Sequence, residues 1–436
     1  MSAEISQLSD LKFGDWNRPE GGTEMQLLLS AIILVLVATL GTATGADLAL
    51  PKSVVKNVSP AASPAAMEQL GKLIFFDKGL SVNNNQPCAT CHSPAVGFSG
   101  PDSSINALGG IYMGSVDGLF VNRKPPSAAY AGDSPILHKQ DDGTWCGGMF
   151  WDGRATGEKL GDALTEQAQM PFLNPPEQAL PGSDVLVQRV CKANYAGLFR
   201  SVWGKDACRD ADRAYEYIAR SVAAYERSKE VNPYSSKYDY FLKGKAALTP
   251  KEAKGLALFN DEGKGKCARC HPSSINTEHP GPILFTDFTY DNLGLPKNPL
   301  NPFYYQFGLN PSGPHWVDLG LGGFLKSPSE YGKHKVATLR NVDKRPYPAF
   351  VKAYGHNGYF KSLESIVHFY NTRDVLPVCS TPLATGDIPG DNCWPPPEVP
   401  ETVNKKELGN LGLSNEEEAC IVAFLKTLSD GWKPVR

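Results

Sequence analysis

Two short motifs contain the residues of this sequence that are best suited to metal chemistry. In each motif a histidine directly follows the second of two cysteines that stand three positions apart. The residues are Cys88, Cys91 and His92 in the first half of the chain, and Cys267, Cys270 and His271 in the second. This spacing lets both thiols bond to the vinyl groups of one haem while the histidine reaches the iron from the proximal side. The sequence therefore predicts two covalently bound haem c groups.

Two other uses of paired cysteines fit these motifs less well. A structural zinc site needs a second pair of ligands at close spacing, and neither motif has such a pair nearby. A thioredoxin-like redox site needs a strand–helix–strand pattern around the cysteines, and that pattern is missing too. Covalent haem attachment is the best-supported use of both motifs.

The methionines limit what can bind the second iron from its distal side. The six methionines are Met1, Met25, Met67, Met113, Met149 and Met170. No residue after 170 can therefore offer a thioether, and the second haem is not a His/Met electron carrier unless the two halves exchange ligands. The remaining options are histidine, tyrosine, another weak donor or an open position.

The segment after residue 361 is expected to form a helix with one continuous apolar face. Four residues at helical spacing make up this face: Leu363, Ile366, Val367 and Tyr370. Tyr370 therefore points inward, where its phenolate could bind ferric iron and favour higher oxidation states. His368 lies about 200° around the helix from Tyr370 and points away. A core tyrosine that binds no metal is the alternative interpretation.

The first half offers an acid and an amide after an aromatic motif. The motif reads Phe150-Trp-Asp-Gly-Arg154 and includes Trp151, and Gln167, Pro171 and Glu177 follow it in a proline-rich loop. A haem that splits peroxide needs an open distal side and a group that moves a proton between the two oxygens. Glu177 could move that proton and Gln167 could orient the peroxide, although surface loops also contain such residues.

The chain contains a diverged internal repeat. In each half an apolar helix precedes the cysteine motif, at 67–76 and 253–259, and an amphipathic helix closes the half, at 211–227 and 414–428. Ser63-Pro64 marks a helix start before 67–76, a capping box at 249–252 leads into the helix at 253–259, and Ser414 is the expected N-cap of the closing helix at 414–428. With 35 prolines and 42 glycines, the rest of the chain favours irregular loops. We predict a mainly α-helical fold with extensive loops, at most a few short strands, and two cytochrome-c-like domains that each bind one haem.

These patterns also predict where the domains begin and end. Four segments are expected: a leader or export segment at 1–46, an N-terminal domain at 47–229, a linker at 230–249 and a C-terminal domain at 250–436. An apolar run of 14 residues at 27–40 is shorter than the 18 or more of a usual membrane span. Small residues follow it, as in a leader-peptidase site. We expect Met25 to be the true start and the protein to be exported to the periplasm; an uncleaved anchor or a buried helix is the alternative.

The six cysteines outside the haem motifs form an even set, which in an exported protein indicates disulfides. Proximity in the chain favours two pairs and leaves a third by remainder: Cys191–Cys208, Cys379–Cys393 and Cys146–Cys420. Unpaired buried thiols are the alternative.

The charge distribution argues against nucleic acid as a partner. The formal net charge is −3, and the first 24 residues alone hold five acids and two bases. The remainder is therefore close to neutral, whereas phosphate binding needs a basic face.

Together these residues resemble the bacterial di-haem cytochrome c peroxidase family, and within it the branch of MauG and its relatives. The resemblance extends over nearly all of residues 65–430 and includes both haem motifs, the Phe-Trp-Asp-Gly-Arg motif and the Gln-x3-Pro-x5-Glu spacing. It also includes three later stretches, at 285–294, 339–342 and 356–370.

The resemblance implies roles for several residues. The first haem would react with hydrogen peroxide, with His92 as its proximal ligand and Gln167, Pro171 and Glu177 in its distal pocket. Trp151 would lie between the haems as an electron relay, and a plain core tryptophan is the alternative.

Two positions favour the MauG-like branch. Fourteen residues after the histidine that corresponds to His356, the peroxidases have a methionine ligand and the MauG-like enzymes a tyrosine; here this position is Tyr370. Sixteen residues after the haem-bound histidine the peroxidases have a distal histidine, and here that position is Leu108. The resemblance thus implies a tyrosine-ligated second haem and a first haem that no histidine blocks.

The chain departs from the family in two places. The run from Trp151 to Gln167 is six residues longer than in the peroxidases, which weakens the placement of Trp151. The family's calcium site between the haems uses a Thr-x-Pro where this chain reads Val351-Lys-Ala-Tyr-Gly-His356, so a bound calcium is not supported.

The resemblance leaves the electron source open. Electrons could come from aromatic side chains of a partner protein, as in MauG. Tyr370 favours this interpretation. They could instead come from a small cytochrome c or cupredoxin, which would make the protein a peroxide scavenger. Pure electron transfer or sensing, and oxygenase action on an organic substrate, are further alternatives. The sequence does not indicate the oligomeric state.

Overall fold

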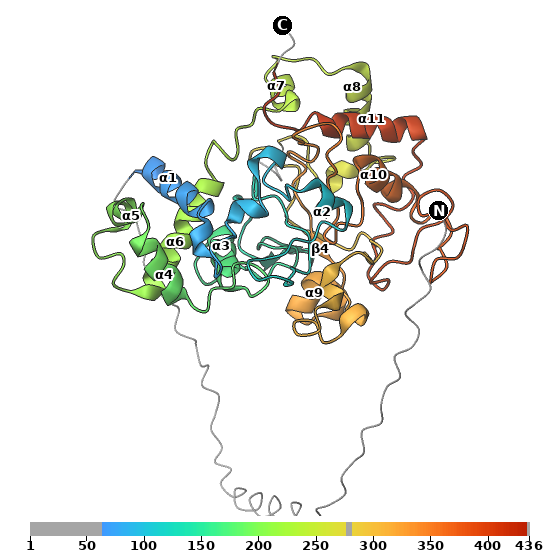
Figure 1. The fold of residues 1–436 in the computed structure, drawn as a ribbon. Coiled ribbons are helices and arrows are strands. Elements are labelled where there is room, and N and C mark those ends of the chain that lie inside the picture. Colours follow the sequence, from blue (N-terminus) through green and yellow to red (C-terminus); the bar gives the residue numbers. More distant parts are fainter. Residues whose placement is uncertain (1–62, 276–280, 434–436) are drawn as a thin grey trace, which may run out of the picture. The chain divides into compact units, whose positions relative to one another are not determined.

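We describe the chain from a computed structural model, which covers residues 63–275 and 281–433. These residues form helices joined by long irregular segments, with two short antiparallel ribbons (Figure 1). The helices are α1 (Pro64–Phe75), α2 (Ser103–Ala107), α3 (Ala163–Leu173), α4 (Ser183–Lys192), α5 (Ala196–Trp203), α6 (Ala211–Glu226), α7 (Lys237–Leu242), α8 (Pro250–Asn260), α9 (Gly320–Leu325), α10 (Leu363–Thr372) and α11 (Asn415–Lys426). The strands are β1 (His138–Lys139), which pairs with β2 (Trp145–Cys146), and β3 (Tyr290–Asp291), which pairs with β4 (His334–Lys335). The predicted mainly helical fold with few short strands is confirmed.

The helices begin at the side chains that the sequence marks as caps. Ser63, Ser362 and Ser414 each accept a hydrogen bond from a backbone N–H in the first turn of α1, α10 and α11. Thr249 and Glu252 form the predicted capping box of α8. These contacts satisfy N–H groups that have no partner within the helix.

Two hydrophobic clusters organise the described residues. The first is built mainly from α1, α3, α4, α5 and α6, and the second from α8, α10 and α11 (Figure 1). The predicted linker at 230–249 contains α7, and Tyr238 of α7 is buried in the second cluster. The domain boundaries stay predictions. The α7 part of the predicted linker is helical and packs against the second hydrophobic cluster.

The two clusters share one packing device, a glycine where the first helix crosses the last. A Cβ on Gly71 of α1 would lie 1.8 Å from the carbonyl oxygen of Ser221 in α6. A Cβ on Gly255 of α8 would lie 1.9 Å from the carbonyl oxygen of Cys420 in α11. Only glycine permits such close backbone approach. The repeat that the sequence shows is thus also a repeat of helix packing.

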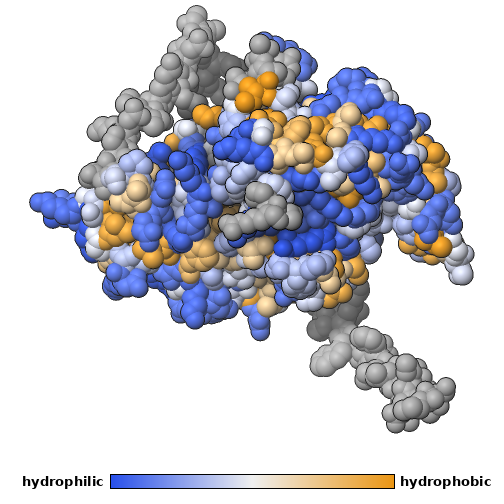
Figure 2. Space-filling view, turned by 90° about the horizontal axis from the view of Figure 1, so that it is seen from above, coloured by the Kyte–Doolittle hydropathy of each residue, from blue (hydrophilic) through white to orange (hydrophobic). Residues whose placement is uncertain are grey.

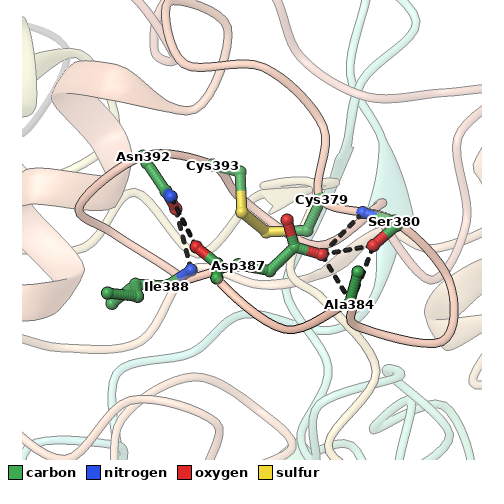
Figure 3. Close-up of a disulfide and its surroundings, with 8 residues drawn as sticks. Cys379, Ser380, Ala384, Asp387, Ile388, Asn392 and Cys393 are labelled. Carbon is green, nitrogen blue, oxygen red and sulfur yellow. Dashed lines mark hydrogen bonds between the residues drawn. A yellow bond between two sulfur atoms is a disulfide. The ribbon is translucent and has the colours of Figure 1, made fainter.

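Two of the three predicted disulfides form. Cys191 pairs with Cys208, and Cys379 with Cys393. Figure 3 shows the second disulfide, with Asp387 accepting hydrogen bonds from the loop that the disulfide closes.

The predicted Cys146–Cys420 pair is wrong. Cys146 lies at the end of β2 with its thiol 3.4 Å from the carbonyl oxygen of Asp287, whereas Cys420 is buried in α11 within the second hydrophobic cluster. Both thiols are buried and free. This pair was inferred only because the two cysteines were left after the other pairs had been assigned. The inference failed because two buried cysteines need not be neighbours.

Among the described residues, no helix is long and apolar enough to cross a membrane. The predicted leader at 1–46 lies outside them. On the face seen in Figure 2, separate hydrophobic patches are surrounded by hydrophilic residues.

Candidate functional site

Both cysteine motifs form a short helical turn that presents its histidine to a cavity. The backbone N–H of His92 donates to the carbonyl of Cys88 at 3.0 Å, and that of His271 donates to the carbonyl of Cys267 at 2.9 Å. All four motif cysteines are free, although four others in the chain are disulfide-bonded. The thiols are therefore available for thioether bonds.

The two motif histidines are held in the form that binds a metal. The imidazole Nδ1 of His92 lies 3.2 Å from the carbonyl oxygen of Phe98, and that of His271 lies 2.7 Å from the carbonyl oxygen of Phe285. A carbonyl at Nδ1 fixes the proton there and leaves Nε2 free for a metal. Burial lowers the pKa of both histidines, that of His271 to about 4. Both are therefore neutral near neutral pH.

The first cavity, of about 820 Å³, adjoins the first motif and collects the predicted distal residues. Gln167, Pro171 and Glu177 all line it together with Cys88, Cys91 and His92. Gln167 and Pro171 lie on α3 and not in a loop as predicted; Glu177 lies in the turn that follows. The helix begins at Asp162, whose side chain caps it, and Pro171 lies inside the helix, two residues before its end.

Glu177 is half-buried beside one amide donor. Its carboxylate accepts a hydrogen bond from the side chain of Asn174 at 2.6 Å. Burial raises the pKa of Glu177, while Asn174 and the more distant Arg154 lower it in part. A carboxyl group with a raised pKa can both accept and return a proton near neutral pH.

The first cavity contains no second histidine among its described lining residues. Leu108 stands at the C-terminal cap of α2, is 67 % exposed, and does not line the cavity. Three methionines, Met113, Met149 and Met170, do line it, and the sequence reasoning gave them no role there.

The second cavity, of about 300 Å³, adjoins the second motif. Cys267, Cys270, His271 and Tyr370 line it together with the other three residues of the α10 apolar face. Burial raises the pKa of the Tyr370 phenol. His368 points elsewhere: its ring contacts the carboxylate of Glu418 at 3.0 Å and the carbonyl oxygen of Gly390 at 2.9 Å. The helical periodicity thus placed both side chains correctly.

Trp151 lines both cavities. Its indole Nε1 donates to the carbonyl oxygen of Lys124 at 2.7 Å, and its own carbonyl accepts from the backbone N–H of Lys335 at 2.9 Å. The indole is thus held by the first half of the chain, and the backbone of the same residue by the second half.

A charged network beside Trp151 was not predicted. Arg123 donates to Asp152, the neighbour of Trp151, at 2.6 Å, and to both carboxylate oxygens of Asp318 at 2.6 and 2.7 Å. Asp318 in turn lies against His334 and His356. These residues come from distant segments of the chain, so no local spacing in the sequence predicts that they meet.

Comparison with known proteins agrees with this geometry. The family model described as "Di-haem cytochrome c peroxidase" matches residues 65–247. The methylamine utilization protein MauG of Paracoccus denitrificans is 34% identical over 369 residues, which are 84% of this chain and 89% of that protein. The chain belongs to the di-haem cytochrome c peroxidase family.

Other members of the di-haem peroxidase family are also similar. Cytochrome-c peroxidase IdrP1 of a Pseudomonas species is 29% identical, with 80% of this chain and 83% of that protein covered. The crystal structure of the diheme peroxidase BthA from Burkholderia thailandensis has a TM-score of 0.69 and 30% sequence identity, with 85% of this chain and 89% of that chain covered. The protein is therefore an oxidoreductase of the di-haem peroxidase type, and its family implies two c-type haems.

The residues present fit two such haems. Each motif has two free thiols, a neutral imidazole with Nδ1 already bound to a carbonyl, and an adjoining cavity. Each motif also packs against one hydrophobic cluster, through Cys88 and Ala89 in the first case and Cys267 and Ala268 in the second. An apolar cavity with a few polar groups is what a large cofactor requires.

Proposed function

We propose that this protein reduces hydrogen peroxide in its first cavity with electrons that pass from the second cavity through Trp151. The single observation that carries the proposal is that Trp151 lines both cavities while each cavity adjoins its own cysteine motif. When bound, the two haems supply the redox-active irons. Cys88, Cys91 and His92 would hold the first haem. Cys267, Cys270, His271 and Tyr370 would hold the second.

The first cavity supplies the groups that peroxide cleavage needs. Glu177 takes the proton from the near oxygen of hydrogen peroxide and returns it to the far oxygen, which leaves as water. Gln167 orients the far oxygen, and Pro171 forms part of the same wall. Two electrons and two protons convert one hydrogen peroxide into two waters, and the electrons arrive by way of Trp151.

We infer that the electrons come from aromatic side chains of a partner protein. Tyr370 in the second cavity supports this, because a phenolate ligand favours higher oxidation states of iron. Similarity to MauG supports it as well. A small cytochrome c or cupredoxin is the second candidate donor, and the similarity to proteins named cytochrome-c peroxidase favours that one.

We further propose export to the periplasm and no calcium between the haems. The two disulfides support export, because disulfides persist in oxidising compartments. The ammonium group of Lys352 donates to three carbonyl oxygens, those of Val96, Asn341 and Lys344, at 2.9 to 3.2 Å. Burial lowers the pKa of Lys352 to about 7, and this amine stands in the segment where the family has its calcium ligands.

The test uses the purified holoprotein. We expect a ferric spectrum with one high-spin and one low-spin haem, and both spectra should change within one rapid reaction with hydrogen peroxide. Steady-state peroxide turnover with a reduced small cytochrome c, and without it, then separates the two donors. Two low-spin haems that do not react with peroxide would contradict the proposal.

A further inference from the structure

Three buried side chains meet in the wall of the second cavity, beside Trp151. They are Asp318, which precedes α9, His334 of β4, and His356 of the irregular segment before α10. Each is less than 9 % exposed, and their ligand atoms all lie within 4.8 Å of one another. The ring of His356 lies 6.5 Å from that of Trp151, centroid to centroid.

The two imidazoles leave a nitrogen each without a partner. His334 Nδ1 lies 3.0 Å from the carbonyl oxygen of Gly332, so this nitrogen carries the proton. The Nε2 atoms of His334 and His356 are buried and have no hydrogen-bond partner among the described residues. They lie 3.3 and 3.8 Å from the two carboxylate oxygens of Asp318. A buried polar atom without a hydrogen-bond partner destabilises the fold. We therefore expect a proton or a metal ion to be bound at these nitrogens.

The geometry argues for a proton and against a metal ion. The two rings are stacked, with centroids 3.4 Å apart and planes inclined by only 6°. Imidazole binds metals along a lone pair in the plane of its ring, and the lone pairs of two parallel rings do not converge on one ion. Both carboxylate oxygens of Asp318 are also bound by Arg123, at 2.6 and 2.7 Å. A proton on either Nε2 needs none of this geometry to change.

The cluster can hold one such proton and not two. A proton on His334 Nε2 would face the carboxylate of Asp318, 3.3 Å away. The second ring is 3.4 Å away, and like charges at this distance in a buried site do not coexist. Burial first, and His334 second, hold the pKa of His356 well below its usual value. The two rings therefore behave as one site with one proton.

The charges that face this pair come from four elements. The carboxylate of Asp318 faces both rings. Arg123 binds this carboxylate, and Asp152 binds Arg123 on its other side. Glu398 accepts from the backbone N–H of Asp318 at 3.1 Å, and burial raises the pKa of Glu398 to about 7. Lys335 follows His334, but its ammonium turns to the carbonyl oxygens of Gly147 and Phe288.

We propose that the Asp318–His334–His356 cluster holds one exchangeable proton that it releases when the second haem site loses an electron. Loss of the electron adds one positive charge next to the cluster, and release of one proton to solvent restores the local charge. The reason is Coulombic, because two charges that are buried in the protein interact much more strongly than the same two charges in water. The proposal rests on the proposed function only in placing a haem at Cys267 and Cys270.

The test is the midpoint potential of the second haem in the holoprotein, measured by spectroelectrochemistry as a function of pH. We expect it to fall by about 59 mV per pH unit over the pH range in which the cluster exchanges its proton, because one proton accompanies one electron. A wild-type potential that does not change with pH would overturn the proposal, whatever the variants do.

Variants identify the group. His334→Gln and His356→Gln should each reduce the slope by more than half, while His138→Gln, an exposed histidine of β1, should leave it unchanged. A slope that survives in both variants, or that disappears only in Glu398→Gln, would overturn the proposal. So would a third metal ion per chain in elemental analysis that is lost in His334→Gln. Peroxide reactivity does not enter this measurement, so the two proposals can fail separately.

Discussion

The two cavities begin from the same motif and differ in what stands opposite the histidine. The first is the larger, at about 820 Å³ against 300 Å³, and is lined by the amide of Gln167 and the half-buried acid Glu177. The second is lined by the phenol of Tyr370. The proximal side is fixed by five consecutive residues in both cases, whereas the distal residues come from α3 and its following turn in one case and from α10 in the other. This difference supports our proposal that one site handles peroxide and the other stores oxidising equivalents.

The largest expected effect is on the first cavity. Replacing Glu177 with Gln keeps the size of the side chain but removes the proton acceptor. We expect peroxide reaction, followed by stopped-flow spectroscopy, to slow by roughly 10²–10⁴-fold. Glu158→Gln, an exposed carboxyl nearby in sequence, is the control and should react at the wild-type rate. Equal rates in all three proteins would contradict the role of Glu177.

The helix crossings test whether the two halves are packed alike. Gly71→Ala and Gly255→Ala should each lower the free energy of unfolding by about 1–3 kcal/mol, because the new Cβ meets a carbonyl oxygen. Gly197→Ala in α5, where a Cβ meets nothing within 4 Å, should have no destabilising effect. Chemical denaturation of the three variants measures this. If only one of the two crossing variants is destabilised, the repeat does not extend to the packing.

Trp151 connects the two cavities, and its replacement should separate them. In Trp151→Phe we expect the first haem to react with peroxide normally, while the spectral change of the second haem slows by at least about tenfold, or about 1.4 kcal/mol in barrier. Trp432→Phe is the control, because Trp432 lines neither cavity. Simultaneous changes at both haems in Trp151→Phe would show that the electrons take another route.

The smallest expected effect is a shift in the pH dependence of the peroxide reaction. Burial raises the pKa of Glu177 above its ordinary 4.5. The ionised form accepts the proton of peroxide, so the rate should rise with pH through that raised pKa and fall about tenfold per unit below it. A pH profile of the peroxide reaction locates this limb. Finding the same limb in Glu177→Gln would assign it to another group.

Local patterns in the sequence predicted much of the structure. The caps at Ser63, Thr249, Ser362 and Ser414 began helices where they were expected to, because a cap is a contact within one turn. The face of α10 followed from helical spacing for the same reason. The pairing of Cys146 with Cys420 failed because it was inferred from number alone, and neither cysteine has a nearby partner in the chain.

The proline-rich stretch after Asp162 shows how tertiary packing changed a local reading. Gln167 and Pro171 were expected in a loop, yet both lie on α3, which packs against α6 in the first cluster. A proline inside a helix removes one backbone donor and crowds the carbonyl four residues earlier, so the local pattern favours a loop. The structure nevertheless has a helix here, and its contacts with α6 are ones that the local pattern does not include.

The sequence by itself predicted where two haems would be attached, and it determined which face of α10 is apolar and which family the residues resemble. Those properties depend on residues a few positions apart, whose geometry the backbone fixes locally. Only the tertiary structure decided that Trp151 borders both cavities and that Arg123, Asp318, His334 and His356 meet beside it. These residues lie in segments that are distant in the chain, with 195 positions between Arg123 and Asp318, and contacts between such segments leave no periodic signal.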